Sequence, residues 1–193
     1  MTTVTTAIVV GGGIAGPVAA LALHKAGIEA TVHEAYPRSS DLLGGVIALA
    51  PNGIAALGVV GVDRAVTAAG IPITRQVMAV GDRRLPLPGL ADLPPMYAVA
   101  RHDLYRAVRE RAAAEGIRIE YGRRLVDAQD TGDGVTARFA DGSTVRADVL
   151  LGADGTGSVV RTLIDPDAPG PRYTGVLGFE GLSRHEVDVA RAR

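Results

Sequence analysis

The glycines near the N-terminus are the residues whose spacing is most informative about chemistry. Gly11, Gly13 and Gly16 match the pattern G-x-G-x-x-G, and the last two are separated by Ile14 and Ala15. In a nucleotide-binding turn, the first glycine allows a sharp turn, the second lets a pyrophosphate approach the backbone, and the third lets the helix pack on the sheet. The helix N-terminus then attracts the phosphates. In a chain with 25 glycines, the pattern is also compatible with a simple turn.

A carboxylate follows at the distance that such a site requires. Glu34 ends a β-branched segment 18 residues after Gly16. A carboxylate in this position can accept hydrogen bonds from both ribose hydroxyls of an adenosine. The alternative interpretation is a solvated charge at the end of a strand.

A second candidate site lies at Asp154. An apolar segment ends at Gly152, and a helical pattern resumes at residues 158–163. Ligands of open α/β sheets bind beyond the carboxyl ends of the strands. The Asp154 carboxylate is therefore a candidate acceptor for a sugar or ribityl hydroxyl. A plain Asp-Gly turn is the equally weighted alternative.

The segments around the glycines predict an α/β fold with a parallel sheet. Residues 4–10 are expected to form a strand, residues 14–26 a helix, and residues 29–34 a second strand. This order is a βαβ unit, whose crossover makes its two strands parallel.

The remaining chain alternates between short helices, strands and glycine-rich turns. A polar loop at residues 35–45 precedes these segments. They are predicted as helices at 51–57, 62–69 and 102–115, a hairpin of strands 73–80 and 83–87, an irregular crossing at 85–96, and strands at 117–121, 124–130, 135–139 and 144–151.

The composition excludes several classes of function. Without cysteine there is no disulfide framework, thiolate metal site or thiol nucleophile, and a reducing cytoplasm is the expected location. The 20 basic and 21 acidic residues are evenly spread, so the chain offers no electrostatic surface for nucleic acid or anionic membrane. Glycines and Pro17 interrupt the apolar segment 7–23, which argues against a signal peptide or a membrane span. The four histidines are scattered, and no metal site is expected.

Four motifs, in this order, resemble the class A FAD-dependent aromatic hydroxylases, which are flavoprotein monooxygenases of the para-hydroxybenzoate and salicylate hydroxylase type. The motifs are residues 11–16 with Glu34, 45–53 (GVIALAPNG), 100–104 (ARHDL), and 152–155 leading to Arg161. The resemblance implies a glutathione-reductase-like Rossmann FAD-binding domain with a partial β-sheet substrate domain. It places the FAD-binding domain at residues 1–71 and 98–170, and partial substrate-domain strands at 72–97 and 171–193.

The resemblance also implies roles for individual residues toward the cofactor. Gly11, Gly13 and Gly16, with Ile14 and Ala15, would hold the pyrophosphate of FAD.

At the other positions, Glu34 would hold the adenosine ribose, and Arg101 would reach the phosphate and ribityl region with its planar guanidinium. Asp154 and Gly155 match a motif linked to FAD and NAD(P)H binding, and Gly45 would lie near the isoalloxazine ring. Arg38 would face the adenosine, or it is a solvated loop residue.

The implied activity is a monooxygenation carried by the cofactor. NAD(P)H reduces FAD, O2 adds to form a C4a-hydroperoxide, and one oxygen atom enters a small aromatic or polyketide-like substrate. No catalytic side chain is assigned, because the flavin performs the chemistry. A geranylgeranyl-reductase-like relative is an alternative, whereas the absence of Trp disfavours a halogenase-like one.

Members of this family continue beyond the segments present here. The chain is therefore expected to be an N-terminal portion, with residues 172–180 as the first returning strand of the substrate domain. Such strands expose edges and apolar faces, so we expect a homo-oligomer or a complementary C-terminal chain. The alternative function is a non-catalytic FAD- or ADP-binding or interaction domain.

Overall fold

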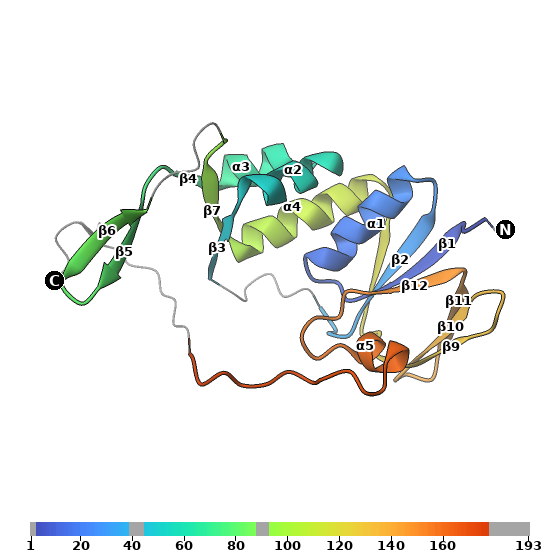
Figure 1. The fold of residues 1–193 in the computed structure, drawn as a ribbon. Helices are drawn as coiled ribbons and strands as arrows, with labels where there is room; N and C mark the ends of the chain where they lie inside the picture. The colour runs from blue at the N-terminus through green and yellow to red at the C-terminus, as the bar shows by residue number, and fades with distance from the viewer. Residues whose placement is uncertain (1–2, 39–44, 88–92, 178–193) are drawn as a thin grey trace.

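The computed structural model describes residues 3–38, 45–87 and 93–177, and its centre is a four-stranded parallel sheet (Figure 1). The strands are β1 (Thr6–Val10), β2 (Glu29–Glu34), β8 (Arg118–Tyr121) and β12 (Val149–Gly152), in the order β12-β1-β2-β8. Helices α1 (Ala15–Lys25) and α4 (Arg101–Ala114) pack side by side on one face of this sheet. The α/β fold class predicted from the sequence is confirmed.

The central strand β1 is buried on both faces, as strands of parallel sheets are. Its side chains alternate, so Val9 joins the core under the helices, while Ile8 and Val10 join a second cluster on the opposite face. That second cluster contains Phe139, which is 1% exposed. The β-branched composition of β1 thus supplies two hydrophobic cores at once.

The opposite face is covered by a small antiparallel sheet. This sheet has the order β11-β10-β9 and consists of β9 (Leu125–Asp130), β10 (Val135–Phe139) and β11 (Thr144–Ala147). The short helix α5 (Val159–Ile164) packs near β9 and β12.

A third layer lies beyond α4. Strands β3 (Val46–Leu49), β7 (Met96–Ala100) and β4 (Ile71–Ile73) form an antiparallel sheet beside α2 (Pro51–Val59) and α3 (Asp63–Ala69). The hairpin of β5 (Gln76–Val80) and β6 (Arg83–Leu87) turns at Gly81, as predicted, and projects away from the body (Figure 1).

Several predicted segments differ in the structure. The single strand predicted at 144–151 is two strands in different sheets, separated at Asp148. The Asp148 carboxylate accepts hydrogen bonds from the backbone N–H groups of Thr5 (2.7 Å) and Thr6 (2.9 Å), which lower its pKa to about 2. A long-range contact, rather than a turn residue, therefore ends β11.

The other differences concern strands with weak local signals. Of the strand predicted at 73–80, residues 76–80 form β5, whereas Ile73 is the last residue of β4. Strands β3 and β7 were not predicted. The predicted strand 172–180 does not form over residues 172–177, and its remaining residues lie outside the described part of the chain.

Candidate cofactor site

The glycine turn between β1 and α1 brings three backbone segments into close contact. A Cβ atom at Gly16 would lie 1.8 Å from the carbonyl oxygen of Gly11, and one at Gly11 would lie 2.3 Å from that of Ala153. Gly11 also has φ +107°, in the region that favours glycine. The tight turn and the close helix packing predicted for these two glycines are therefore both present.

Gly13 differs from Gly11 and Gly16 because a side chain at this position would not overlap any backbone atom. A Cβ atom there would make only ordinary contact, 3.7 Å from the hydroxyl oxygen of Tyr105. Helix α1 begins two residues later, without a side-chain cap and without an acidic residue in its first turn. Its N–H groups and positive dipole end are thus directed at this space with no carboxylate of the first turn to compensate them.

Glu34 connects the end of β2 to the glycine turn. Its carboxylate accepts hydrogen bonds from the backbone N–H groups of Gly12 (2.6 Å) and Tyr36 (2.8 Å). Each carboxylate oxygen accepts one of these bonds and keeps a further lone pair. Glu34 is therefore not a free solvated charge, and it retains the capacity to accept hydroxyl groups.

Arg101 and Tyr105 approach the turn from the first turns of α4. The Arg101 guanidinium donates to the Tyr105 hydroxyl over 3.3 Å, and its Cζ lies 5.6 Å from the centre of the Tyr105 ring. The backbone N–H of Arg101 donates to the carbonyl of Gly45 (2.9 Å). This bond places Gly45 next to the site from the start of β3.

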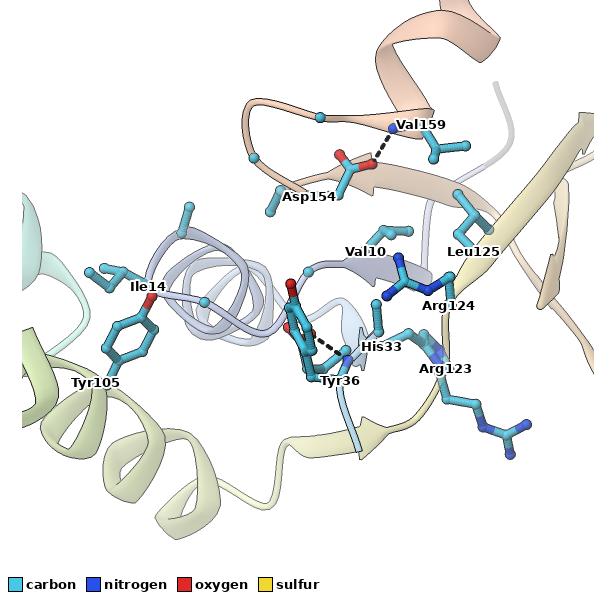
Figure 2. A pocket seen from close by; sticks show the side chains of 18 of the residues that line it. Val10, Ile14, His33, Tyr36, Tyr105, Arg123, Arg124, Leu125, Asp154 and Val159 are labelled. Carbon is cyan, nitrogen blue, oxygen red and sulfur yellow. Dashed lines mark hydrogen bonds between the residues drawn. The ribbon is translucent and has the colours of Figure 1, made fainter. Parts of the chain in front are cut away.

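Asp154 lies in the wall of the site, but its carboxylate is engaged with α5. One oxygen accepts from the backbone N–H of Val159 (2.7 Å, Figure 2), and the other accepts from the Ser158 hydroxyl (2.6 Å). The Asp154 carboxylate therefore caps the N-terminus of α5, so this segment is not only an Asp-Gly turn. Gly155 follows with φ +80° and continues the wall.

These segments surround one cavity of about 490 Å³, at the carboxyl ends of β1, β2 and β12 (Figure 2). Most of the residues predicted from the sequence line it: Gly11, Gly13, Ile14, Ala15, Glu34, Arg101, Asp154 and Gly155. Gly16 lies behind the turn, against Gly11. Arg38 is exposed and borders a smaller adjacent hollow with Gly12, Glu34 and Tyr36.

Other residues that line the cavity were not among the predicted cofactor-binding residues, notably Tyr36, Tyr105, Arg123 and Arg124. The two arginines follow β8 after Gly122, so the strand-end rule that indicated Asp154 would have indicated them as well. The Arg124 guanidinium lies 5.9 Å from the centre of the Tyr36 ring, at a distance typical of a cation–π contact.

His33 also lines the cavity, although only 1% of its surface is exposed. Its ring lies 4.7 Å from that of Phe139, and neither ring nitrogen has a hydrogen-bond partner in the described part of the chain. Burial lowers the pKa of His33; the Glu120 carboxylate, 3.6 Å from its Nδ1, opposes this shift, while Arg123 and Arg118 add to it. Burial therefore favours the neutral form of the His33 imidazole.

Residues 3–38, 45–87 and 93–177 contain neither a metal site nor a membrane-spanning helix. No three histidine, aspartate or glutamate side chains gather as a metal site. None of the helices in these ranges is long and apolar enough to cross a bilayer.

The sequence matches the family described as FAD binding domain over residues 4–191, and the chain belongs to this family. It is 32% identical to the FAD-dependent urate hydroxylase of Klebsiella pneumoniae over an alignment of 196 positions, which covers 96% of this chain and 49% of the hydroxylase. It is 34% identical to the 3-amino-4-hydroxybenzoate 2-monooxygenase of Streptomyces cremeus over 188 residues, with coverage of 90% and 45%.

A solved structure of an oxygenase is also similar to this chain. The tetrameric form of 2-methyl-3-hydroxypyridine-5-carboxylic acid oxygenase superposes with a TM-score of 0.76 and 29% sequence identity, over 85% of this chain and 43% of the oxygenase. The chain thus spans about half the length of the curated relatives that it matches.

Proposed function

We propose that this chain forms the dinucleotide-binding part of a flavoprotein monooxygenase and binds FAD in the cavity at the glycine turn. The observation that carries this proposal is the space at Gly13, which a side chain would narrow and which faces the N-terminus of α1. Gly11 and Gly16 are needed by the protein's own packing, whereas Gly13 leaves room for a ligand. An anion approaching Gly13 meets backbone donors and Arg101 together.

The proposed roles of the surrounding residues follow from their positions. The turn from Gly13 through Ala15 would bind the pyrophosphate, and the Glu34 carboxylate would accept the ribose hydroxyls. Arg101 would balance the phosphate charge.

Four further residues have less direct roles. Arg38 would face the adenosine, Gly45 would leave room for the flavin ring, and the turn at Asp154 and Gly155 would border the ribityl chain. When bound, FAD supplies electron transfer and oxygen activation, with NAD(P)H as the proposed reductant. The protein binds and orients the cofactor and excludes water.

The proposed substrate is a small aromatic ring that receives one oxygen atom from O2. Support comes from the relatives, whose names specify urate, an aminohydroxybenzoate and a hydroxypyridine carboxylate. Because the chain spans about half of these relatives, the activity of the whole protein is part of the proposal. A cytoplasmic location is proposed from the absence of cysteine.

The domain division and the assembly are also proposed. Residues 1–71 and 98–170 would form the cofactor domain, and residues 72–97 and 171–193 would belong to the substrate domain. The exposed β5–β6 hairpin supports association, either with a second copy or with a complementary C-terminal chain. One similar oxygenase is described as a tetramer.

Titration of the 193-residue chain with FAD, followed by flavin fluorescence, tests the cofactor proposal. Gly13→Ala should weaken FAD binding by about tenfold, or about 1.4 kcal/mol, because its Cβ narrows the space over the turn. It should not unfold the chain, because this Cβ makes only ordinary contact with the Tyr105 side chain. Gly53→Ala, in open space on α2, is the matched control and should bind as the parent does.

Consumption of NADPH on addition of an aromatic substrate distinguishes the two functions. FAD binding together with substrate-dependent NADPH oxidation supports the monooxygenase. FAD or ADP binding without oxidation supports a non-catalytic nucleotide-binding domain. A parent chain that binds neither nucleotide would contradict the cofactor proposal.

A further inference from the structure

The phenol of Tyr105 is a polar group whose position the known motifs do not explain. Tyr105 lies on α4, is 9% exposed, and lines the cavity that the glycine turn borders. Its hydroxyl points toward the turn at Ile14 (Figure 2), and it would be 3.7 Å from a Cβ atom at Gly13. The hydroxyl thus faces Gly13 across the space that a ligand would enter.

The Tyr105 hydroxyl can donate one hydrogen bond for which the described residues supply no acceptor. The Arg101 guanidinium can only donate, so in the 3.3 Å contact the Tyr105 oxygen is the acceptor. The hydroxyl's own hydrogen must then be donated elsewhere. Among the described residues, no protein group accepts it. Because the hydroxyl lines the cavity, its hydrogen is available to an acceptor that enters the cavity.

The charge around the hydroxyl favours an anionic acceptor. The Arg101 guanidinium contacts both the oxygen and the ring face of Tyr105, and α1 directs its positive end to the same space. A hydroxyl that accepts a bond from a cation is a stronger donor to an anion, because linked hydrogen bonds polarise one another. Phosphate oxygens meet these conditions better than the uncharged hydroxyls of a ribose.

We propose that Tyr105 is a cofactor-binding residue that donates its hydroxyl hydrogen to a diphosphate oxygen of the nucleotide held over Gly13. This assignment rests on the proposed nucleotide site and adds a donor from α4 to those of the glycine turn. The pyrophosphate would then be bound between two helices, α1 and α4. Arg101 would bind the same group, and Tyr105 would also keep the Arg101 guanidinium in place.

Calorimetric titration of the 193-residue chain with ADP, AMP and adenosine tests this assignment. Tyr105→Phe keeps the buried ring and removes only the hydroxyl. It should weaken ADP binding by about tenfold and leave adenosine binding unchanged. Tyr173→Phe, which removes an exposed hydroxyl outside the cavity, is the matched control and should bind all three as the parent does. The urea midpoint of Tyr105→Phe should equal that of the parent chain.

The same substitution in an Arg101→Ala chain separates direct donation from positioning. Direct donation predicts that Tyr105→Phe still weakens ADP binding when Arg101 is absent. If the phenol acts only by holding Arg101, its removal will have no further effect there, and the assignment is overturned. An equal loss for ADP and adenosine would overturn it as well. A parent chain that binds no nucleotide would contradict the proposed function itself, whereas parent-like ADP binding by Tyr105→Phe contradicts only this inference.

Discussion

The glycine turn joins β1 to α1, the hairpin turn joins β5 to β6, and the surroundings of these two tight turns are opposite. At the glycine turn, backbone atoms of β1, α1 and the segment after β12 approach so closely that no Cβ fits at Gly11 or Gly16. At the hairpin, Gly81 also has a positive φ, but a Cβ atom there would meet nothing within 4 Å. The first turn is therefore determined by its neighbours, and the second by its own residues.

The side chains show the same contrast. Val9 and Val32, which flank the glycine turn, are completely buried. In the hairpin, the register pairs Met78 with Leu85, and these two side chains are about half exposed. No other described element packs extensively on the hairpin, which stands apart in Figure 1. The comparison shows that one part of the chain completes its core, while the other forms locally and exposes an apolar face.

The largest expected effect is at the third glycine of the turn. Gly16→Ala should lower the free energy of unfolding by about 3 kcal/mol or more, because its Cβ overlaps the Gly11 carbonyl and the backbone must move. Urea unfolding followed by circular dichroism measures this loss. Gly53→Ala, with free space around it, should instead raise stability by up to about 1 kcal/mol. If the two substitutions changed the free energy of unfolding equally, the glycine turn would not be packed more tightly than the surroundings of Gly53.

A matched pair of valines tests burial directly. Val32→Ala in β2 should cost about 2 kcal/mol, because it removes buried methyl groups and leaves a cavity. Val80→Ala in β5, at a side chain that is 60% exposed, should change the free energy by less than about 0.5 kcal/mol. Both are measured as urea midpoints of the 193-residue chain. A large loss at Val80 would mean that the hairpin is covered in solution.

His33 provides a pH-dependent effect of intermediate size. Because burial lowers the pKa of His33 below 6.5, the unfolded chain binds more protons than the folded chain as the pH falls below that value. Stability from this residue is thus complete above pH 6.5 and is lost below it, by at most about 1.4 kcal/mol per pH unit. His33→Gln should flatten the dependence of the urea midpoint between pH 7 and 5. His102→Gln changes an exposed side chain and should leave the pH dependence of the urea midpoint as it is in the parent chain.

The smallest effect on stability is expected in the hairpin. Met78→Lys combined with Leu85→Glu places opposite charges on its apolar face, so the free energy of unfolding should change by less than about 0.5 kcal/mol. Association of the chain, measured by sedimentation velocity, should nevertheless decrease if this face is an interface. Val77→Lys, on the opposite face, is the control. Unchanged association in the charged pair would argue against this face as the contact surface.

The elements near the N-terminus could be predicted because their signals are local. The β-branched strand, the three glycines and the second strand ending at Glu34 follow one another within one βαβ unit. The hairpin at Gly81 was equally predictable, since its turn residues are adjacent in sequence. In both cases the predictive pattern consists of residues that are close along the chain, although the contact between Gly11 and Ala153 joins distant segments.

Long-range contacts explain what could not be predicted. Asp148 ends β11 by accepting hydrogen bonds from Thr5 and Thr6, more than 140 residues earlier. Strand β3 exists because β7 pairs with it across about fifty residues. The position of the Tyr105 hydroxyl was not predicted, because nothing in a helical pattern reveals that it faces Gly13, in the turn before α1.

The sequence by itself determined the class of fold and the glycine turn, because residue type and spacing alone decide where a chain can turn sharply and where a helix begins. Only the tertiary structure decided which side chains share the cavity. The tertiary structure brings the Asp154 carboxylate to the N-terminus of α5 and the Glu34 carboxylate to the N–H group of Gly12. It also places Tyr105 and Arg101 opposite the glycine turn. These arrangements depend on how α4 and α5 pack on the sheet, and packing is a property of the whole core rather than of any one segment.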